Sequence, residues 1–419
     1  MHPLPEVVVA QKGAREHFLA ARAFHRLGML RKLVVDWYAP ESRALRCVLS
    51  GLGGQRAASA LSAQCAEIPA EFVRPMRGLG VWSKWVERRA SCNGGVYRGF
   101  TRTDAAFGRS VARLRLPEHD VFFGYSYASL EALEAARRSG RLTIVDQIDP
   151  GPAEFRLVAE EMQRWPELSG LPLEFPASYF GRAKREWEFA DVILVNSDWT
   201  REAIIAEGAD PAKIEVVPLA YEAEGRGSGV GGAGEGFRVQ GSGKERRLSR
   251  GLRVLWLGQV NVRKGIHYLL EAARLLKDEC VEFQVAGPCH IRPEVTQRAA
   301  SSVRWLGPIP RSQVSRLYQE CDLFVLPTLS DGFAITQLEA LAHGLPVITT
   351  TNCGRVVEEG KTGFIVPARN SGALADAIIK FVRNRDLALS MAPACRAAAK
   401  AFSIEAYGRK LAEVIEKRM

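Results

Sequence analysis

Short apolar runs alternate along the chain with longer segments whose apolar residues recur at helical spacing. Unbroken apolar runs of this kind are typical of strands that are covered on both faces of a parallel sheet. The predicted strands are Val7 to Ala10, Leu33 to Val35, Asp120 to Tyr125, Leu142 to Val145, Val254 to Leu257, Phe283 to Ala286, Leu323 to Leu326 and Val347 to Ile348. The amphipathic segments between them predict helices, so the pattern indicates an α/β fold.

The chain is interrupted once by a stretch of a different kind. Residues 222–250 contain nine glycines and few apolar residues, which predicts a flexible connection. With 419 residues the chain is also too long for one ordinary core. We therefore expect an N-terminal domain over residues 1–221 and a C-terminal domain over residues 251–400.

The most informative stretch lies in the second domain, between Leu323 and Thr350. A strand ends at Pro327, a polar turn follows, and a helix is predicted from about Ala334 to His343. Two acids frame this helix, because Asp331 precedes it and Glu339 lies inside it.

The free amides of Gly332, Phe333 and Ala334 would lie between these acids at the helix N-terminus, which suits a phosphate. An acid, an anion site and a second acid match the sugar, diphosphate and ribose of a nucleotide-sugar. The residues alone leave a simpler interpretation open, in which Asp331 is favoured by the helix dipole and Glu339 is solvated.

The charge and cysteine content of the chain indicate which classes of ligand and partner to expect. The chain has 57 basic and 47 acidic residues, a net charge of +10, which favours nucleotide diphosphates or acidic lipid. The basic residues are spread rather than blocked, so we expect no nucleic-acid partner. Its eight cysteines have no CxxC spacing, and no DxD carboxylate pair suggests a divalent ion. We expect no metal or cofactor and a cytoplasmic protein without a spanning helix.

One segment, residues 71–102, is both basic and aromatic. Trp82, Trp85 and the basic residues around them could form a helix that lies on an anionic bilayer at the inner face of the membrane. The sequence favours the simpler interpretation, in which the tryptophan pair packs on the core and the charges stay solvated.

The stretch around Asp331 resembles the signature of glycosyltransferase family 4. The shared features are an acid followed directly by Gly-Phe, and a second acid in a Leu-Glu-Ala helix, with seven residues in all between the two acids. The first acid is usually Glu in that family. The resemblance implies two Rossmann-like domains that face a cleft, the GT-B fold, with the final helix over residues 401–419 crossing back to the first domain. It also implies a retaining transfer of a hexose from a nucleoside diphosphate sugar to a hydroxyl of a sugar, lipid-linked or small-molecule acceptor, in cell-envelope polysaccharide or glycolipid synthesis.

The resemblance also implies roles for particular residues. Asp331 with the backbone of 332–334 would meet the donor sugar and phosphate, and Glu339 would bind the ribose. The string GQVNVRKG is similar to the family's diphosphate loop; Lys264 matches, Gln259 replaces the usual Arg, and Arg263 adds a cation. Without the resemblance, this loop would be read as a solvated basic turn.

Further positions follow from the same resemblance. Gly13 would lie near the donor phosphate or the acceptor, and the loop around Ile309 would cover the base. Many family members carry a His near the reacting centre that this chain lacks, so Gln147 or Asp149 would stand in, near Tyr125 on the acceptor side.

Three other functions stay open at this point. A nucleotide-sugar 2-epimerase shares the fold, a non-catalytic subunit could retain the donor cleft, and a peripheral membrane scaffold could use the tryptophan segment.

Overall fold

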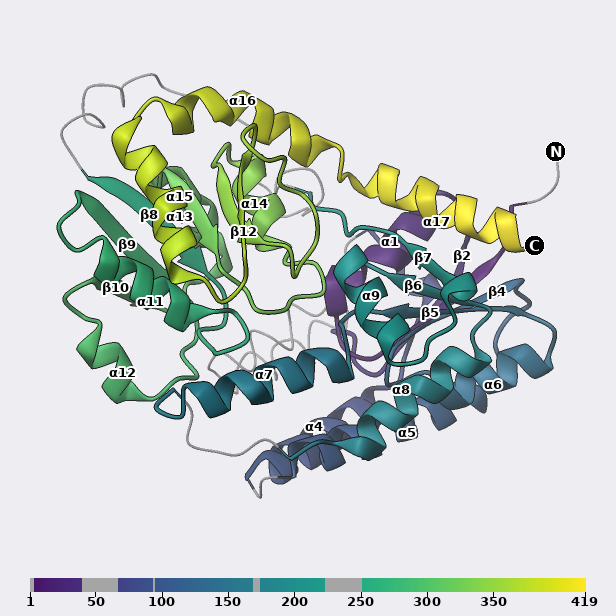
Figure 1. Cartoon of the computed structure of the whole chain (residues 1–419). Coiled ribbons are helices and arrows are strands. Elements are labelled where there is room, and N and C mark those ends of the chain that lie inside the picture. Colours follow the sequence, from purple (N-terminus) through teal and green to yellow (C-terminus); the bar gives the residue numbers. More distant parts are fainter. Residues whose placement is uncertain (1–3, 40–66, 93–94, 169–173, 223–250) are drawn as a thin grey trace.

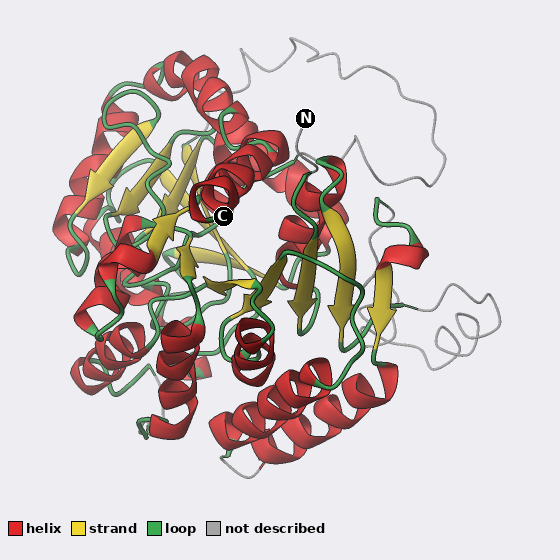
Figure 2. Cartoon of the chain, turned by 90° about the vertical axis from the view of Figure 1, so that its right-hand side faces the viewer, coloured by secondary structure: helices red, strands yellow, loops and turns green. Residues whose placement is uncertain are grey.

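The computed structural model describes residues 4–39, 67–92, 95–168, 174–222 and 251–419 (Figure 1). All but the first residue of the predicted glycine-rich connection therefore lie outside the described residues. Two parallel sheets make up the architecture, each with helices on both faces (Figure 2). This is the predicted arrangement of two Rossmann-like domains.

The N-terminal domain is built on a seven-stranded sheet in the order β3-β2-β1-β4-β5-β6-β7, in which every neighbouring pair is parallel. Its strands are β1 (Val7–Gln11), β2 (Leu30–Val35), β3 (Val73–Pro75), β4 (Val121–Tyr125), β5 (Leu142–Gln147), β6 (Val192–Val195) and β7 (Ile214–Val216). Its α-helices are α1 (Leu19–Arg26), α4 (Arg77–Cys92), α5 (Val96–Ala112), α6 (Leu130–Arg138), α7 (Pro152–Arg164), α8 (Ala177–Phe189) and α9 (Asp198–Ala206).

The C-terminal domain is built on a six-stranded parallel sheet in the order β10-β9-β8-β11-β12-β13. Its strands are β8 (Leu252–Leu257), β9 (Val281–Ala286), β10 (Val303–Gly307), β11 (Leu323–Leu326), β12 (Val347–Thr350) and β13 (Gly363–Val366). Its helices are α11 (Ile266–Leu275), α12 (Pro293–Arg298), α13 (Arg311–Glu320), α14 (Thr336–Ala342), α15 (Ser371–Arg383) and α16 (Leu387–Lys400).

The last helix, α17 (Ile404–Arg418), lies across the N-terminal domain, as the resemblance implied (Figure 1). It packs on α1 so closely that a Cβ at Gly408 would lie 3.3 Å from Cδ1 of Leu27. Lys417 forms an ion pair of 2.9 Å with Glu215 in β7. The chain therefore joins the two domains a second time at its C-terminal end.

The first helix departs from the sequence pattern. The pattern predicts a helix from Arg15 to Leu27, but α1 begins only at Leu19. Glu16, His17 and Phe18 have left-handed backbone with φ of 52°, 49° and 61°, which is costly for residues with a Cβ. The side-chain amide of Gln11 donates to the Arg15 carbonyl at 2.7 Å, which ties this turn to the end of β1.

No helix in the described part of the chain is long and apolar enough to cross a membrane.

Candidate functional site

The candidate site lies where the strand order of the C-terminal sheet reverses, between β8 and β11. Ligands of open α/β sheets bind outside the carboxyl ends of the strands at such a point. The loops that follow these two strands are held together, because the amide of Leu329 donates to the Arg263 carbonyl at 2.9 Å. Gly265 permits this approach, since a Cβ there would lie 1.8 Å from the Pro327 carbonyl oxygen.

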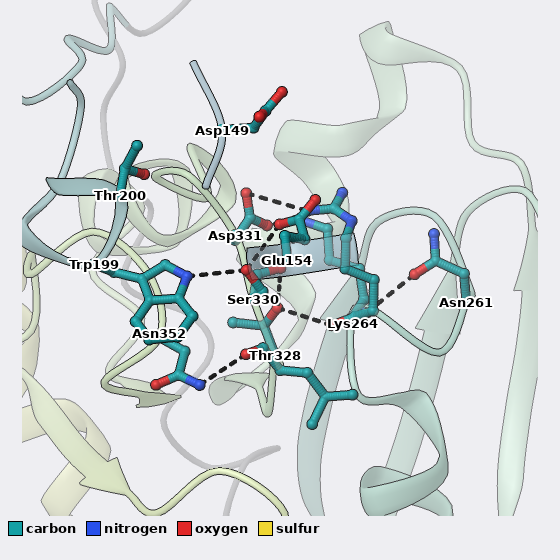
Figure 3. Close-up of polar contacts among 12 residues, drawn as sticks. Asp149, Glu154, Trp199, Thr200, Asn261, Lys264, Thr328, Ser330, Asp331 and Asn352 are labelled. Atoms are coloured by element: carbon teal, nitrogen blue, oxygen red, sulfur yellow. Dashed lines mark hydrogen bonds and ion pairs between the residues drawn. The ribbon is translucent and has the colours of Figure 1, made fainter. Parts of the chain in front are cut away.

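Two cations and two carboxylates meet at this point (Figure 3). Lys264 forms an ion pair with Asp331, and both side chains are 13% exposed. The Arg263 guanidinium lies 3.8 Å from an Asp331 oxygen and 3.6 Å from an oxygen of Glu154. It also donates to the Ser330 carbonyl at 3.1 Å. The structure therefore brings together the three residues for which the sequence predicted a catalytic role.

The N-terminal domain supplies partners to this cluster that the sequence analysis did not predict. Glu154 lies in the first turn of α7. Its carboxylate accepts a hydrogen bond of 2.8 Å from the hydroxyl of Ser330, a residue 176 positions later in the chain. Ser330 in turn accepts one of 2.9 Å from the indole N–H of Trp199 in α9 (Figure 3). The cluster thus crosses from one domain to the other, and no local motif could have revealed it.

Burial changes the proton affinities in this cluster. It lowers the pKa of Lys264 to about 7, and the positive charge of Arg263 acts in the same direction. Burial raises the pKa of Glu154, while Arg263 opposes that shift. Asp331, which contacts Lys264, favours the charged form of the lysine. The Lys264 amine can therefore bind or release a proton close to neutral pH.

The backbone after Asp331 differs from the prediction. The helix α14 begins at Thr336 instead of Ala334, because Ala334 has left-handed backbone with φ of 63°. In the described part of the chain, the amides of Gly332, Phe333 and Ala334 donate to no other group. They stay candidates for an anion, but they belong to a turn instead of a helix end.

Gly332 has a packing role that its motif does not reveal. A Cβ there would lie 2.2 Å from the carbonyl oxygen of Ile148, in the N-terminal domain. The same carbonyl accepts a hydrogen bond of 2.9 Å from the side-chain amide of Asn196. This glycine is therefore required where the two domains touch.

Glu339 lies in the first turn of α14, closer to its start than predicted. At 1.5 Å per residue it is about 4.5 Å along the axis from Thr336, where about 8 Å was expected. Its carboxylate accepts a hydrogen bond of 3.0 Å from the hydroxyl of the buried Tyr318. A fully solvated Glu339 is therefore ruled out.

Three further residues, Gln259, Ile309 and Gly13, were predicted to contact the donor. Gln259 is exposed just after β8, and Ile309 packs partly against the core. The Gly13 amide is already engaged, since it donates to the Asp36 carboxylate at 2.7 Å. Nothing in these contacts assigns the three residues a ligand, and their roles stay predictions.

A cavity of about 440 Å³ lies beside the charge cluster, between the two domains. Its wall on the N-terminal side is largely aromatic, and Arg263 and His290 line it from the other side. Asp149, Glu154 and Arg263 face it together. The aromatic lining comprises Tyr97, Phe100, Tyr127, Phe155, Tyr179 and Phe180.

Of the three residues predicted for the acceptor side, only Asp149 lines this cavity. Its carboxylate accepts hydrogen bonds from the Tyr127 hydroxyl at 2.6 Å and the Gly151 amide at 2.8 Å. Gln147 is buried behind it and donates to the Asp149 carbonyl at 2.9 Å. Both Tyr125 and Tyr127 are buried, but Tyr127 lines the cavity and Tyr125 does not.

Among the residues that the structure describes, no group of three or more His, Cys, Asp or Glu could hold a metal ion. Independence from metal stays a prediction.

Comparison with known proteins supports the resemblance. Residues 251–384 match the family described as "Glycosyl transferases group 1". The chain carries a group 1 glycosyltransferase domain. This domain contains β8, β11 and α14, and with them Arg263, Lys264 and Asp331.

Relatives of known sequence extend the match beyond this glycosyltransferase domain. The chain is 29% identical over 244 residues to a D-inositol 3-phosphate glycosyltransferase of Corynebacterium urealyticum, covering 54% of this chain and 56% of that protein. It is 26% identical over 186 residues to the amylovoran biosynthesis glycosyltransferase AmsK of Erwinia amylovora, covering 41% and 46%. The chain thus spans about half the length of these curated relatives.

Solved structures confirm the GT-B fold. HepE of Anabaena, solved with UDP-glucose, has a TM-score of 0.60 at 15% identity, and the match covers 99% of this chain and 100% of HepE. The sucrose-phosphate synthase of Thermosynechococcus elongatus has a TM-score of 0.62 at 15% identity, covering 99% and 98%.

Proposed function

We propose that the chain transfers a hexose from a nucleoside diphosphate sugar to a hydroxyl acceptor, with retention at the anomeric carbon. The observation that carries this proposal is the meeting of Arg263 and Lys264 with Asp331 at the switch point of the C-terminal sheet. The resemblance to HepE, which was solved with UDP-glucose, supports a uridine nucleotide as donor.

The two cations suit the charge that develops in the reaction. When the sugar leaves, the diphosphate gains negative charge, and fixed positive groups in a water-poor site stabilise it. Lys264 is held by Asp331, and its backbone amide donates to the side chain of Asn261 at 3.0 Å. Both ends of the residue are therefore held in place before a donor arrives, which limits the ordering that binding requires.

Asp331 has a second role in this proposal. Once the diphosphate takes over Lys264, the carboxylate becomes free to accept hydrogen bonds from hydroxyls of the donor sugar. Arg263 stays within ion-pair distance of the carboxylate. Asp331 thereby orients the sugar while Lys264 holds the leaving group.

The acceptor would enter through the aromatic cavity, where Asp149 can bind its hydroxyl. Tyr127 and Gly151 hold that carboxylate by hydrogen bonds. Retention requires no protein nucleophile in the proposed route, in which the acceptor attacks from the face that the diphosphate leaves. Synthesis of a cell-envelope polysaccharide is the proposed setting, in line with the amylovoran relative.

The test uses the purified chain with UDP-glucose, UDP-galactose, UDP-N-acetylglucosamine and GDP-mannose. We expect one of them to raise the melting temperature and to be hydrolysed slowly without acceptor. Proton NMR of the first product should show the anomeric configuration of the donor. Stabilisation without any turnover would instead indicate a non-catalytic binding subunit, and an inverted product would refute retention.

A further inference from the structure

The helix α4 presents one face to solvent that is basic and apolar at the same time. Val81 is 61% exposed and Trp85 is 58% exposed, and they lie one turn apart at the centre of this face. Exposed cations flank them on the same side of the helix, namely Arg77, Lys84, Arg88 and Arg89. We call these six residues the basic face of α4.

The exposure of Trp85 corrects the interpretation that the sequence favoured. Trp82 is half-buried, with the Arg102 guanidinium 5.5 Å from the centre of its ring. Trp85 instead stays in solvent with the Arg89 guanidinium 5.5 Å from its ring. The two tryptophans therefore do not pack on the core as a pair.

The acids in the described part of the hairpin formed by α4 and α5 are largely buried, and one of them, Glu87, lies 3.4 Å from the Lys84 ammonium. The two acids between Arg77 and Arg109 are Glu87 and Asp104, whose side chains are 14% and 4% exposed. Both are ion-paired to Lys12 on the inner side, at 2.8 and 2.6 Å. Arg98 and Arg102 on α5 add exposed positive charge.

We propose that the basic face of α4 docks on the surface of a membrane that contains anionic lipid. Basic residues near such a surface are attracted to its negative potential, and tryptophan is favoured at the level of the headgroups. A nucleic acid would satisfy the cations but would leave Val81 without a partner. The apolar centre inside a cationic rim fits a lipid interface better.

Docking would also place the cavity close to the membrane. The same hairpin supplies Tyr97 and Phe100 of α5 to the cavity wall. An acceptor held in a membrane could then reach Asp149 without leaving the bilayer surface. The proposal itself does not depend on the transferase activity, because the basic face contains none of the residues assigned to it.

The test is co-sedimentation of the full chain with vesicles of phosphatidylcholine, alone or with about a third of phosphatidylglycerol. We expect binding at least tenfold stronger to the anionic vesicles, and loss of that binding at high salt. Each basic residue contributes about 1 kcal/mol, which is about fivefold. Arg88→Gln with Arg89→Gln should therefore weaken binding about 25-fold.

Matched variants distinguish docking through the basic face of α4 from a general attraction of the positively charged chain to anionic vesicles. Lys277→Gln with Arg298→Gln removes the same charge from exposed positions of the C-terminal domain and should change binding less than about twofold. Val81→Ser with Trp85→Ser should weaken binding and abolish the quenching of tryptophan fluorescence by brominated lipid. Circular dichroism melting checks that each variant folds.

Equal binding to neutral and anionic vesicles, or none to either, would overturn the proposal. So would equal losses in the α4 variant and the C-terminal control. Unchanged binding after the Val81 and Trp85 substitutions would also overturn it, since the face would then bind polyanions through charge alone.

Discussion

The exchange of partners at Lys264 leads to the sharpest prediction. In the free protein its ammonium is paired with Asp331, so a diphosphate must compete with that carboxylate. Lys264→Ala removes a charge-assisted hydrogen bond worth about 1.5–3 kcal/mol, or about 10- to 150-fold in affinity. It also leaves Asp331 with Arg263, 3.8 Å away, as its remaining close cation.

Asp331→Asn should have the opposite consequence for the nucleotide. It removes the competing carboxylate, so the nucleoside diphosphate should bind equally well or up to about 1 kcal/mol more tightly. Transfer from the intact donor should nevertheless fall, because the sugar loses a charged acceptor of its hydroxyl groups. Adding Asp331→Asn to Lys264→Ala should recover part of the lost affinity, since the unpaired carboxylate no longer repels the phosphates.

The assay is isothermal titration calorimetry of the four proteins with UDP and with GDP, at a pH one unit below the pKa of Lys264. Lys277→Ala, which removes an exposed lysine of the same domain, serves as the control. If Asp331→Asn weakened binding as much as Lys264→Ala does, the proposed exchange of partners would be refuted. Unchanged affinity in Lys264→Ala would remove this lysine from the site.

The remaining predictions use the same nucleotides. Because the pKa of Lys264 is lowered to about 7, donor affinity should be full below that pH and should fall by up to about tenfold per pH unit above it. Titrations of an intact nucleotide-sugar across this pH range would show the decline. Lys264→Arg should bind the nucleotide-sugar without it. Turnover should survive EDTA; an activity lost in chelator and restored by Mn²⁺ or Mg²⁺ would contradict the proposed charge stabilisation. Glu339→Gln should weaken ribonucleotide binding by about 1–3 kcal/mol and reduce the preference over the 2′-deoxy form, and equal discrimination in both proteins would exclude contact with the ribose.

The sequence predicted local elements well where packing and propensity agree. The runs Val254 to Leu257, Leu323 to Leu326 and Val347 to Ile348 are apolar without interruption, which is typical of strands buried on both faces, and the structure has β8, β11 and β12 there. The ends of α9 also follow from residue types that can be read in the sequence. Ser197 accepts a hydrogen bond from the Thr200 amide at its start, and Gly208 has φ of 97° after its end.

Two helix starts were predicted too early, and the reason is the same in both. Around His17 and at Ala334 the backbone adopts left-handed conformations that no side-chain pattern signals. At Ala334 the neighbouring backbone is held from elsewhere in the fold, since the Gly354 amide donates to the Phe333 carbonyl at 3.2 Å. A local pattern cannot contain that information.

What the sequence by itself determined is the C-terminal half of the candidate site. Arg263, Lys264 and Asp331 lie at the carboxyl ends of β8 and β11, and neighbouring parallel strands bring such ends together. Only the tertiary structure decided which groups of the N-terminal domain meet them. Two of these groups, Glu154 and Trp199, lie in the first turns of α7 and α9, and Tyr127 follows β4. None of these segments carries a chemical motif in its sequence. Their side chains reach the cleft because the two domains face each other.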